Sequence, residues 1–71
     1  METSEPMRLD EILQAALARE EEARDFYSSM ATGCRVEFVR ELLEWLADEE
    51  SKHVHLIQEL ITKLSLGKDT V

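Results

Sequence analysis

Residues 36–64 read VEFVRELLEWLADEESKHVHLIQELITKL and decide the fold of this 71-residue chain. Positions spaced alternately three and four apart share one face of a helix. Along this segment, that face carries Val36, Val39, Leu43, Leu46, Glu50, His53, Ile57, Leu60 and Leu64. The pattern predicts a long amphipathic helix that packs through this face. Two of the nine side chains, Glu50 and His53, are polar and lie in the middle of an otherwise apolar stripe.

A second stripe with the same spacing precedes it and contains one carboxylate. Its members are Leu9, Leu13, Ala16, Glu20, Ala23, Tyr27 and Met30. Between the two stripes, Gly33 can end a helix in a left-handed cap, and Gly67 offers a similar stop further on. We therefore predict a single domain over residues 1–71, with helices at about 7–31 and about 36–66 and a loop at about 32–35. Pro6 suits the first helical turn, with Ser4 or Glu5 as its cap.

The short loop predicts an all-α fold in which the two helices form an antiparallel hairpin. The second helix carries a further apolar flank that one partner helix cannot cover: Phe38, Leu42, Trp45 and Leu56. A chain of this length buries a marginal core by itself, and its one cysteine, Cys34, excludes an intrachain disulfide. We therefore expect two hairpins to pair into a four-helix bundle, as a homodimer or within a higher homo-oligomer.

Composition excludes two classes of partner. The formal net charge is -8, from 16 acidic and 8 basic residues, so we expect no binding to a nucleic-acid backbone. The longest apolar runs are far shorter than a membrane span needs, so we expect no membrane insertion. The acidic N-terminus lacks the apolar region of a signal peptide, and a lone thiol suits a reducing compartment. These features predict a cytoplasmic protein.

Glu20, Glu50 and His53 are the only ionisable side chains in the two stripes apart from Tyr27. A carboxylate buried in such a stripe must be neutralised, paired or bound to a metal. Two copies of the hairpin would supply four carboxylates and two imidazoles, which are the ligands of carboxylate-bridged di-iron and di-manganese bundles. One imidazole per ion favours iron or manganese over calcium or magnesium. Alternatively, the buried acids only fix the register of a self-associating helical module.

The spacing from the loop predicts a mismatch along the helices. Counted from Gly33, Glu20 lies thirteen positions back, whereas Glu50 and His53 lie seventeen and twenty positions on. At 1.5 Å per residue, we expect an axial offset of roughly 6–10 Å that the loop or the helix tilt must absorb.

Two segments carry a family resemblance. Residues 20–27, EEEARDFY, contain Glu-x6-Tyr, and residues 43–53, LEWLADEESKH, contain Glu-x-x-His. The chain resembles the ferritin-like rubrerythrin superfamily over about residues 9–62, and most of all its half-size members, the encapsulated ferritins. In those proteins two subunits complete one ferroxidase site. The resemblance implies that Glu20, Glu50 and His53 bind iron, with Tyr27 beside them in a supporting role.

The resemblance also implies a function. It predicts a di-iron ferroxidase that oxidises Fe(II) with O2 or peroxide for iron storage or detoxification, with Mn or Zn as substitute metals. It further implies a ferritin-like bundle in the cytoplasm or inside an encapsulin shell. A rubrerythrin-like peroxide reductase with a separate electron donor is the alternative enzyme, because the chain has no Cys-x-x-Cys pair of its own.

Overall fold

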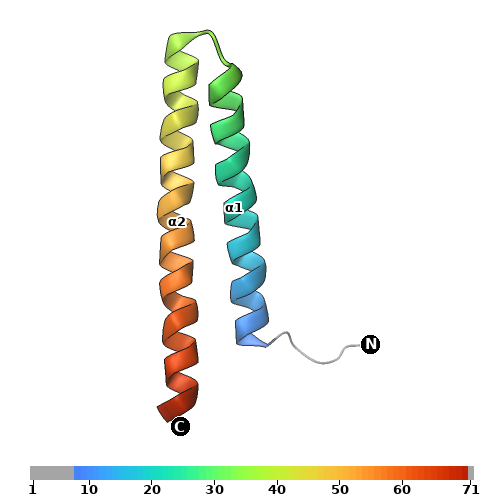
Figure 1. Cartoon of the computed structure of the whole chain (residues 1–71), viewed down its shortest axis with the longest axis vertical. Coiled ribbons are helices and arrows are strands. Elements are labelled where there is room, and N and C mark those ends of the chain that lie inside the picture. Colours follow the sequence, from blue (N-terminus) through green and yellow to red (C-terminus); the bar gives the residue numbers. More distant parts are fainter. Residues whose placement is uncertain (1–7, 71) are drawn as a thin grey trace, which may run out of the picture.

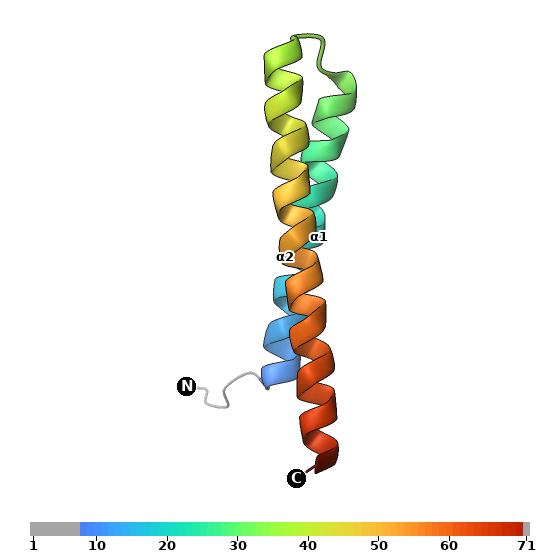
Figure 2. The ribbon, with the colours of Figure 1, turned by 90° about the vertical axis from the view of Figure 1, so that its left-hand side faces the viewer.

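The computed structural model describes the backbone of residues 8–70 and the side chains of residues 8–67. It consists of two helices, α1 (Leu9–Gly33) and α2 (Glu37–Thr70), joined by residues 34–36. The helices run antiparallel and side by side along the whole of α1, and α2 extends beyond it (Figure 1, Figure 2). The predicted all-α helical hairpin is confirmed. Within residues 8–70, neither helix is long and apolar enough to cross a membrane.

The start of α1 is fixed by its own first turn. The Glu11 carboxylate accepts a hydrogen bond of 3.2 Å from the backbone N–H of Arg8. The Arg8 carbonyl in turn accepts the first helical bond, from Ile12 N–H at 2.9 Å. Acidic side chains in the first turn also suit the positive end of the helix dipole. The predicted Pro6 turn and its caps, Ser4 and Glu5, lie outside the described residues.

The connection between the helices is tighter than predicted. Gly33 is the last residue of α1 and its φ is not positive, so the predicted left-handed cap is wrong. The chain turns instead at Cys34, which is extended (φ -88°, ψ 130°) and donates its N–H to the Ala31 carbonyl at 3.2 Å. The Val36 carbonyl then accepts the first hydrogen bonds of α2. An extended residue, Cys34, redirects the chain after α1 in place of a left-handed glycine.

The predicted stop at Gly67 is also wrong, because α2 continues through it to Thr70. A glycine within a helix costs about 1 kcal/mol relative to alanine. That cost weakens a helix without ending it when its neighbours stay helical.

Small and β-branched side chains form the contact between the two helices. Ala31, Ala47 and Val54 are the buried apolar residues in the described part of the chain. On α2, the half-buried and buried positions along this contact include Leu43, Ala47, Glu50, Val54, Ile57, Ile61 and Leu64, and Val39 and Leu46 are half-buried as well. His53 and Leu60, which the sequence pattern placed in the stripe, are exposed at its edge. A strict seven-residue repeat drifts by about 20° per heptad around a straight helix, so some of its members leave the contact.

Most of the exposed large apolar residues of both helices gather on one side of the hairpin. Each residue advances 100° around its helix axis, and by this count the exposed positions lie on the same flank of the contact in α1 and in α2. We call this surface the apolar face; it comprises Ile12, Phe26, Met30, Phe38, Leu42, Trp45, Leu56 and Leu60, which are 40% to 76% exposed. The predicted uncovered flank of α2 is therefore present, and α1 extends it.

Candidate metal centre

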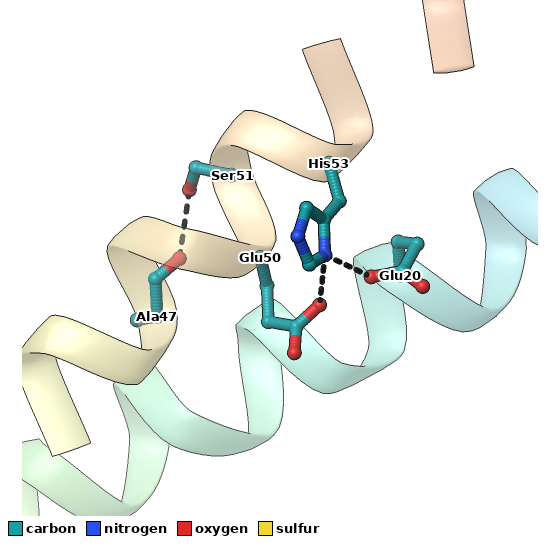
Figure 3. A network of polar contacts seen from close by, with 5 residues as sticks. All are labelled: Glu20, Ala47, Glu50, Ser51 and His53. Atoms are coloured by element: carbon teal, nitrogen blue, oxygen red, sulfur yellow. Dashed lines mark hydrogen bonds and ion pairs between the residues drawn. The ribbon is translucent and has the colours of Figure 1, made fainter. Parts of the chain in front are cut away.

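Three predicted ligand residues converge halfway along the hairpin. Glu20 projects from the middle of α1, and Glu50 and His53 project from successive turns of α2 (Figure 3). His53 Nδ1 lies 3.2 Å from Glu20 Oε1 and 3.3 Å from Glu50 Oε1. One potential ligand atom from each residue lies within 4.8 Å of the others. No other group of three or more His, Cys, Asp or Glu side chains converges in this way among the described residues.

The loop absorbs the axial offset that the count from Gly33 predicts. Glu20 lies as far before Gly33, the last residue of α1, as Glu50 lies after Glu37, the first residue of α2, because 33 - 20 and 50 - 37 are equal. Residues 34–36 cross the end of the hairpin and add no length along either helix. Glu20 and Glu50 therefore lie at the same level.

The three side chains differ in exposure in a way that fits their positions on the helices. Glu50 points into the helix contact with 19% of its side chain exposed, and Glu20 has 31% exposed. His53 lies towards the apolar face, with 53% exposed. The two helices therefore cover one side of the cluster. The other side, next to the apolar face, is open.

Hydrogen bonds between the three groups shift their proton affinities. A hydrogen bond between the two carboxyl groups lowers the pKa of Glu20 and raises the pKa of Glu50, so Glu50 takes up a proton more readily than Glu20 does. The hydrogen bond to Glu20 raises the pKa of His53, although desolvation works in the opposite direction. The raised pKa values of Glu50 and His53 favour protonation, which reduces the negative charge of the metal-free cluster.

The donor set fits a divalent transition metal. Carboxylate oxygens and an imidazole nitrogen are suitable ligands for Fe, Mn and Zn, and all three donors can face one point between the helices. Metal ligands must be deprotonated, so the protons of Glu50 and His53 would leave when the ion binds. One chain offers only three donor residues here, which is half of a di-iron ligand set.

Ser51, which lies near the cluster, and Tyr27, which is predicted to support it, make no hydrogen bond to the three cluster residues among the described contacts. Ser51 donates its hydroxyl to the Ala47 carbonyl at 3.1 Å and so is tied to the α2 backbone (Figure 3). Tyr27 lies two helical turns from Glu20, roughly 10 Å along α1. Its ring packs edge-on against Phe26 at a centroid distance of 5.4 Å, and none of the described hydrogen bonds of the cluster reaches it. A supporting role for Tyr27 stays a prediction.

The second histidine, His55, is not part of the cluster. His55 Nε2 is 3.4 Å from Glu59 Oε2, and both side chains are largely exposed. This pair lies on one helix, and no third ligand group joins it among residues 8–67, so it provides a natural control for His53.

Comparison with known proteins gives one result. The family model described as Rubrerythrin matches residues 11–71, a range that contains Glu20, Glu50 and His53. Searches of curated proteins and of solved structures gave no significant match. The narrower resemblance to encapsulated ferritins therefore stays a prediction. With most of both helices and all three cluster residues inside the matched range, the chain belongs to the rubrerythrin family.

Proposed function

We propose that the protein is a di-iron ferroxidase, which oxidises Fe(II) with O2 or peroxide and serves iron storage or detoxification. One observation carries the proposal. Oxygen atoms of Glu20 and Glu50 and a nitrogen of His53 meet within 4.8 Å, and they come from both helices of a rubrerythrin-family hairpin. Membership of this family supports an iron-binding, ferritin-like function.

The complete site needs a second copy of the chain. A two-fold pair of hairpins brings four carboxylates and two imidazoles together, the ligand set of di-iron carboxylate bundles. The open side of the cluster supports this arrangement, because His53 lies beside the apolar face that a single hairpin leaves uncovered. Dimerisation would therefore form the metal centre and bury the apolar face in one step.

Each residue has a distinct part in the proposed site. Glu20 and Glu50 would hold the ions through their carboxylate oxygens, and the His53 of each copy would supply one imidazole nitrogen. Four carboxylates balance the charge of two dications. When bound, a pair of iron ions supplies the electrons for reducing the oxidant. Protons held at Glu50 and on the His53 ring would be released as metal binds, so binding strengthens as pH rises.

The ferroxidase proposal is tested by Fe(II) oxidation, followed by the near-ultraviolet absorbance of Fe(III) after aerobic addition of Fe(II). Wild type is compared with Glu20→Ala, Glu50→Ala and His53→Ala, and iron per chain is measured in parallel. We expect all three variants to bind less iron and to oxidise Fe(II) no faster than buffer alone.

The matched control is His55→Ala, which removes an exposed histidine paired with a glutamate outside the cluster. It should keep wild-type rates. Undiminished oxidation and iron content in both Glu50→Ala and His53→Ala would end the proposal. That result would favour a helical module whose buried acids only set the register.

The family match itself supports a second candidate, a peroxide reductase that takes electrons from a separate donor. Turnover with peroxide and a chemical reductant, compared with O2 under the same conditions, separates the two. Multiple turnovers with peroxide and not with O2 would favour the reductase, and oxidation with O2 in proportion to added Fe(II) would favour the ferroxidase.

We further propose that the protein works in the cytoplasm, either free or inside an encapsulin shell. In the second case the shell would receive the oxidised iron. This extension rests on the resemblance to encapsulated ferritins. Co-purification with a co-expressed shell protein tests it, and separate elution of the two proteins would count against it.

A further inference from the structure

An apolar hollow lies at the open end of the hairpin, away from the loop. Its volume is about 380 Å³, and its lining consists of Leu9, Ile12, Leu13, Leu60, Lys63 and Leu64. Leu9, Ile12 and Leu60 are among the exposed large apolar residues. Leu60 is seven residues from His53, roughly 10 Å along α2, so the hollow is separate from the metal centre. An apolar hollow that is open to water favours an apolar side chain that fills it.

The helix ends leave this hollow beside the start of α1. By the count that places the two carboxylates of the cluster at one level, Leu9 lies opposite Ile61. Lys63 and Leu64 therefore belong to the part of α2 that extends beyond the start of α1 (Figure 1). Residues 1–7 read METSEPM and lie outside the described residues. Because they directly precede this end of the hairpin, they have the shortest path to the hollow.

The first turn of α1 directs one of these residues towards the hollow. Arg8 is the N-cap residue, with an extended backbone (φ -70°, ψ 154°), and it donates its N–H to the carboxylate of Glu11 at the third helical position. In such a capped first turn, an apolar residue before the N-cap often packs against an apolar residue at the fourth helical position. These two positions are Met7 and Ile12. Ile12 lines the hollow, so the same packing places Met7 at its edge.

We propose that Met7 occupies the hollow of its own chain, where it packs against Ile12 of α1 and Leu60 of α2. A methionine side chain is unbranched and flexible, so it adapts to an irregular apolar space. Its burial removes apolar surface of both helices from water at once. The contact holds the start of α1 against the extended end of α2. This inference goes beyond the proposed function and does not depend on it.

The charges of the segment and of the hollow are complementary. Glu2 and Glu5 are the charged side chains of residues 1–7. Lys63 is exposed and is the one charged residue of the lining. Among residues 8–67, Lys63 forms no ion pair. An acidic segment that runs past Lys63 is therefore attracted to it, and this attraction adds to the apolar contact of Met7.

Methyl NMR on the metal-free, full-length protein tests the contact. The sequence has three methionines, Met1, Met7 and Met30, so isotope-labelled methionine methyl groups give few signals. Comparison with the variants Met7→Leu and Met30→Leu assigns these signals. In protein that is also labelled at isoleucine and leucine, we expect nuclear Overhauser cross-peaks from the Met7 methyl group to the methyl groups of Ile12 and Leu60.

A mixture of two kinds of chain distinguishes the other possible occupants. Chains labelled only at methionine are mixed with chains labelled only at isoleucine and leucine, so that cross-peaks report contacts between chains alone. We expect the cross-peaks of Met7 to vanish in this mixture. Cross-peaks of Met7 that persist there at full strength would place it in the hollow of a second copy and overturn the inference. Cross-peaks from Leu60 to a second copy in place of Met7 would overturn it as well.

Thermal unfolding at fixed protein concentration gives a second measurement. Met7→Ala removes the contact and should lower the Tm by about 4–8 °C, whereas Met7→Leu keeps an apolar side chain of similar size and should retain most of the Tm. The matched control is Thr3→Ala, four residues earlier in the same segment, which should leave the Tm unchanged. A Met7→Ala chain with the Tm of wild type, or a Thr3→Ala chain that loses as much as Met7→Ala does, would overturn the inference.

Discussion

Metal binding to the cluster should release protons, and this can be counted. In the metal-free chain, the hydrogen bond with Glu20 raises the pKa of Glu50, and the pKa of His53 is raised above its ordinary 6.5. Both groups must be deprotonated to bind an ion. Binding below the pKa of Glu50 therefore displaces up to two protons per chain, and binding at slightly acidic to neutral pH displaces about one.

The size of the pH effect follows from these counts. Each displaced proton changes the affinity about tenfold per pH unit. We expect the affinity for Mn(II), a substitute that avoids oxidation during the measurement, to rise steeply at acidic pH. The rise should be about tenfold per unit just below the pKa of His53 and flatten above it.

Calorimetric titration in two buffers of different ionisation enthalpy gives both the affinity and the number of protons released. His53→Ala should lower the proton count by about one near neutral pH, whereas His55→Ala should leave it unchanged. An affinity that does not vary between about pH 5 and pH 8, or a proton count that His53→Ala leaves unchanged, would refute the reasoning.

Three further predictions concern stability and association. Val54→Ala removes two buried carbons from the helix contact and should cost about 1.5 to 2.5 kcal/mol in urea unfolding at fixed protein concentration, whereas a loss below 0.5 would show that the contact is poorly packed. The pKa of His53 is raised in the folded state, so protonated His53 stabilises the fold fully below pH 6.5, and this stabilisation is lost as pH rises through the folded pKa. The Tm of the metal-free protein should therefore fall over that range in wild type and not in His53→Ala. Trp45 is the one tryptophan of the sequence and is 57% exposed in a single hairpin. Its fluorescence emission should shift to longer wavelength on dilution, because the ring becomes exposed to water when dimers separate. An emission that does not depend on concentration would argue against its burial in a dimer.

The ligand residues could be predicted because they break a pattern. Glu20, Glu50 and His53 are polar residues at positions that periodicity assigns to apolar stripes, and such exceptions need a physical compensation. The hairpin could be predicted for a related reason, since two apolar stripes with a short break between them have few ways to pack.

The rest depended on details that periodicity does not contain. Glu20 and Glu50 lie at the same level because α1 ends at Gly33 and α2 begins at Glu37. The extended backbone of Cys34, which turns the chain after Gly33, sets these two positions. The exposure of His53 came from the drift between a seven-residue repeat and a straight helix. This drift moves the imidazole to the rim of the contact and towards the face proposed for the second copy.

The central claim is that two chains share one di-iron centre built from Glu20, Glu50 and His53. Native mass spectrometry of protein loaded with Fe(II) without oxygen measures chain number and metal number together. We predict a dimer that carries two iron ions, and a Glu50→Ala variant that carries fewer. A monomer that retains iron, or a dimer whose iron content is unchanged by Glu50→Ala, would contradict the account.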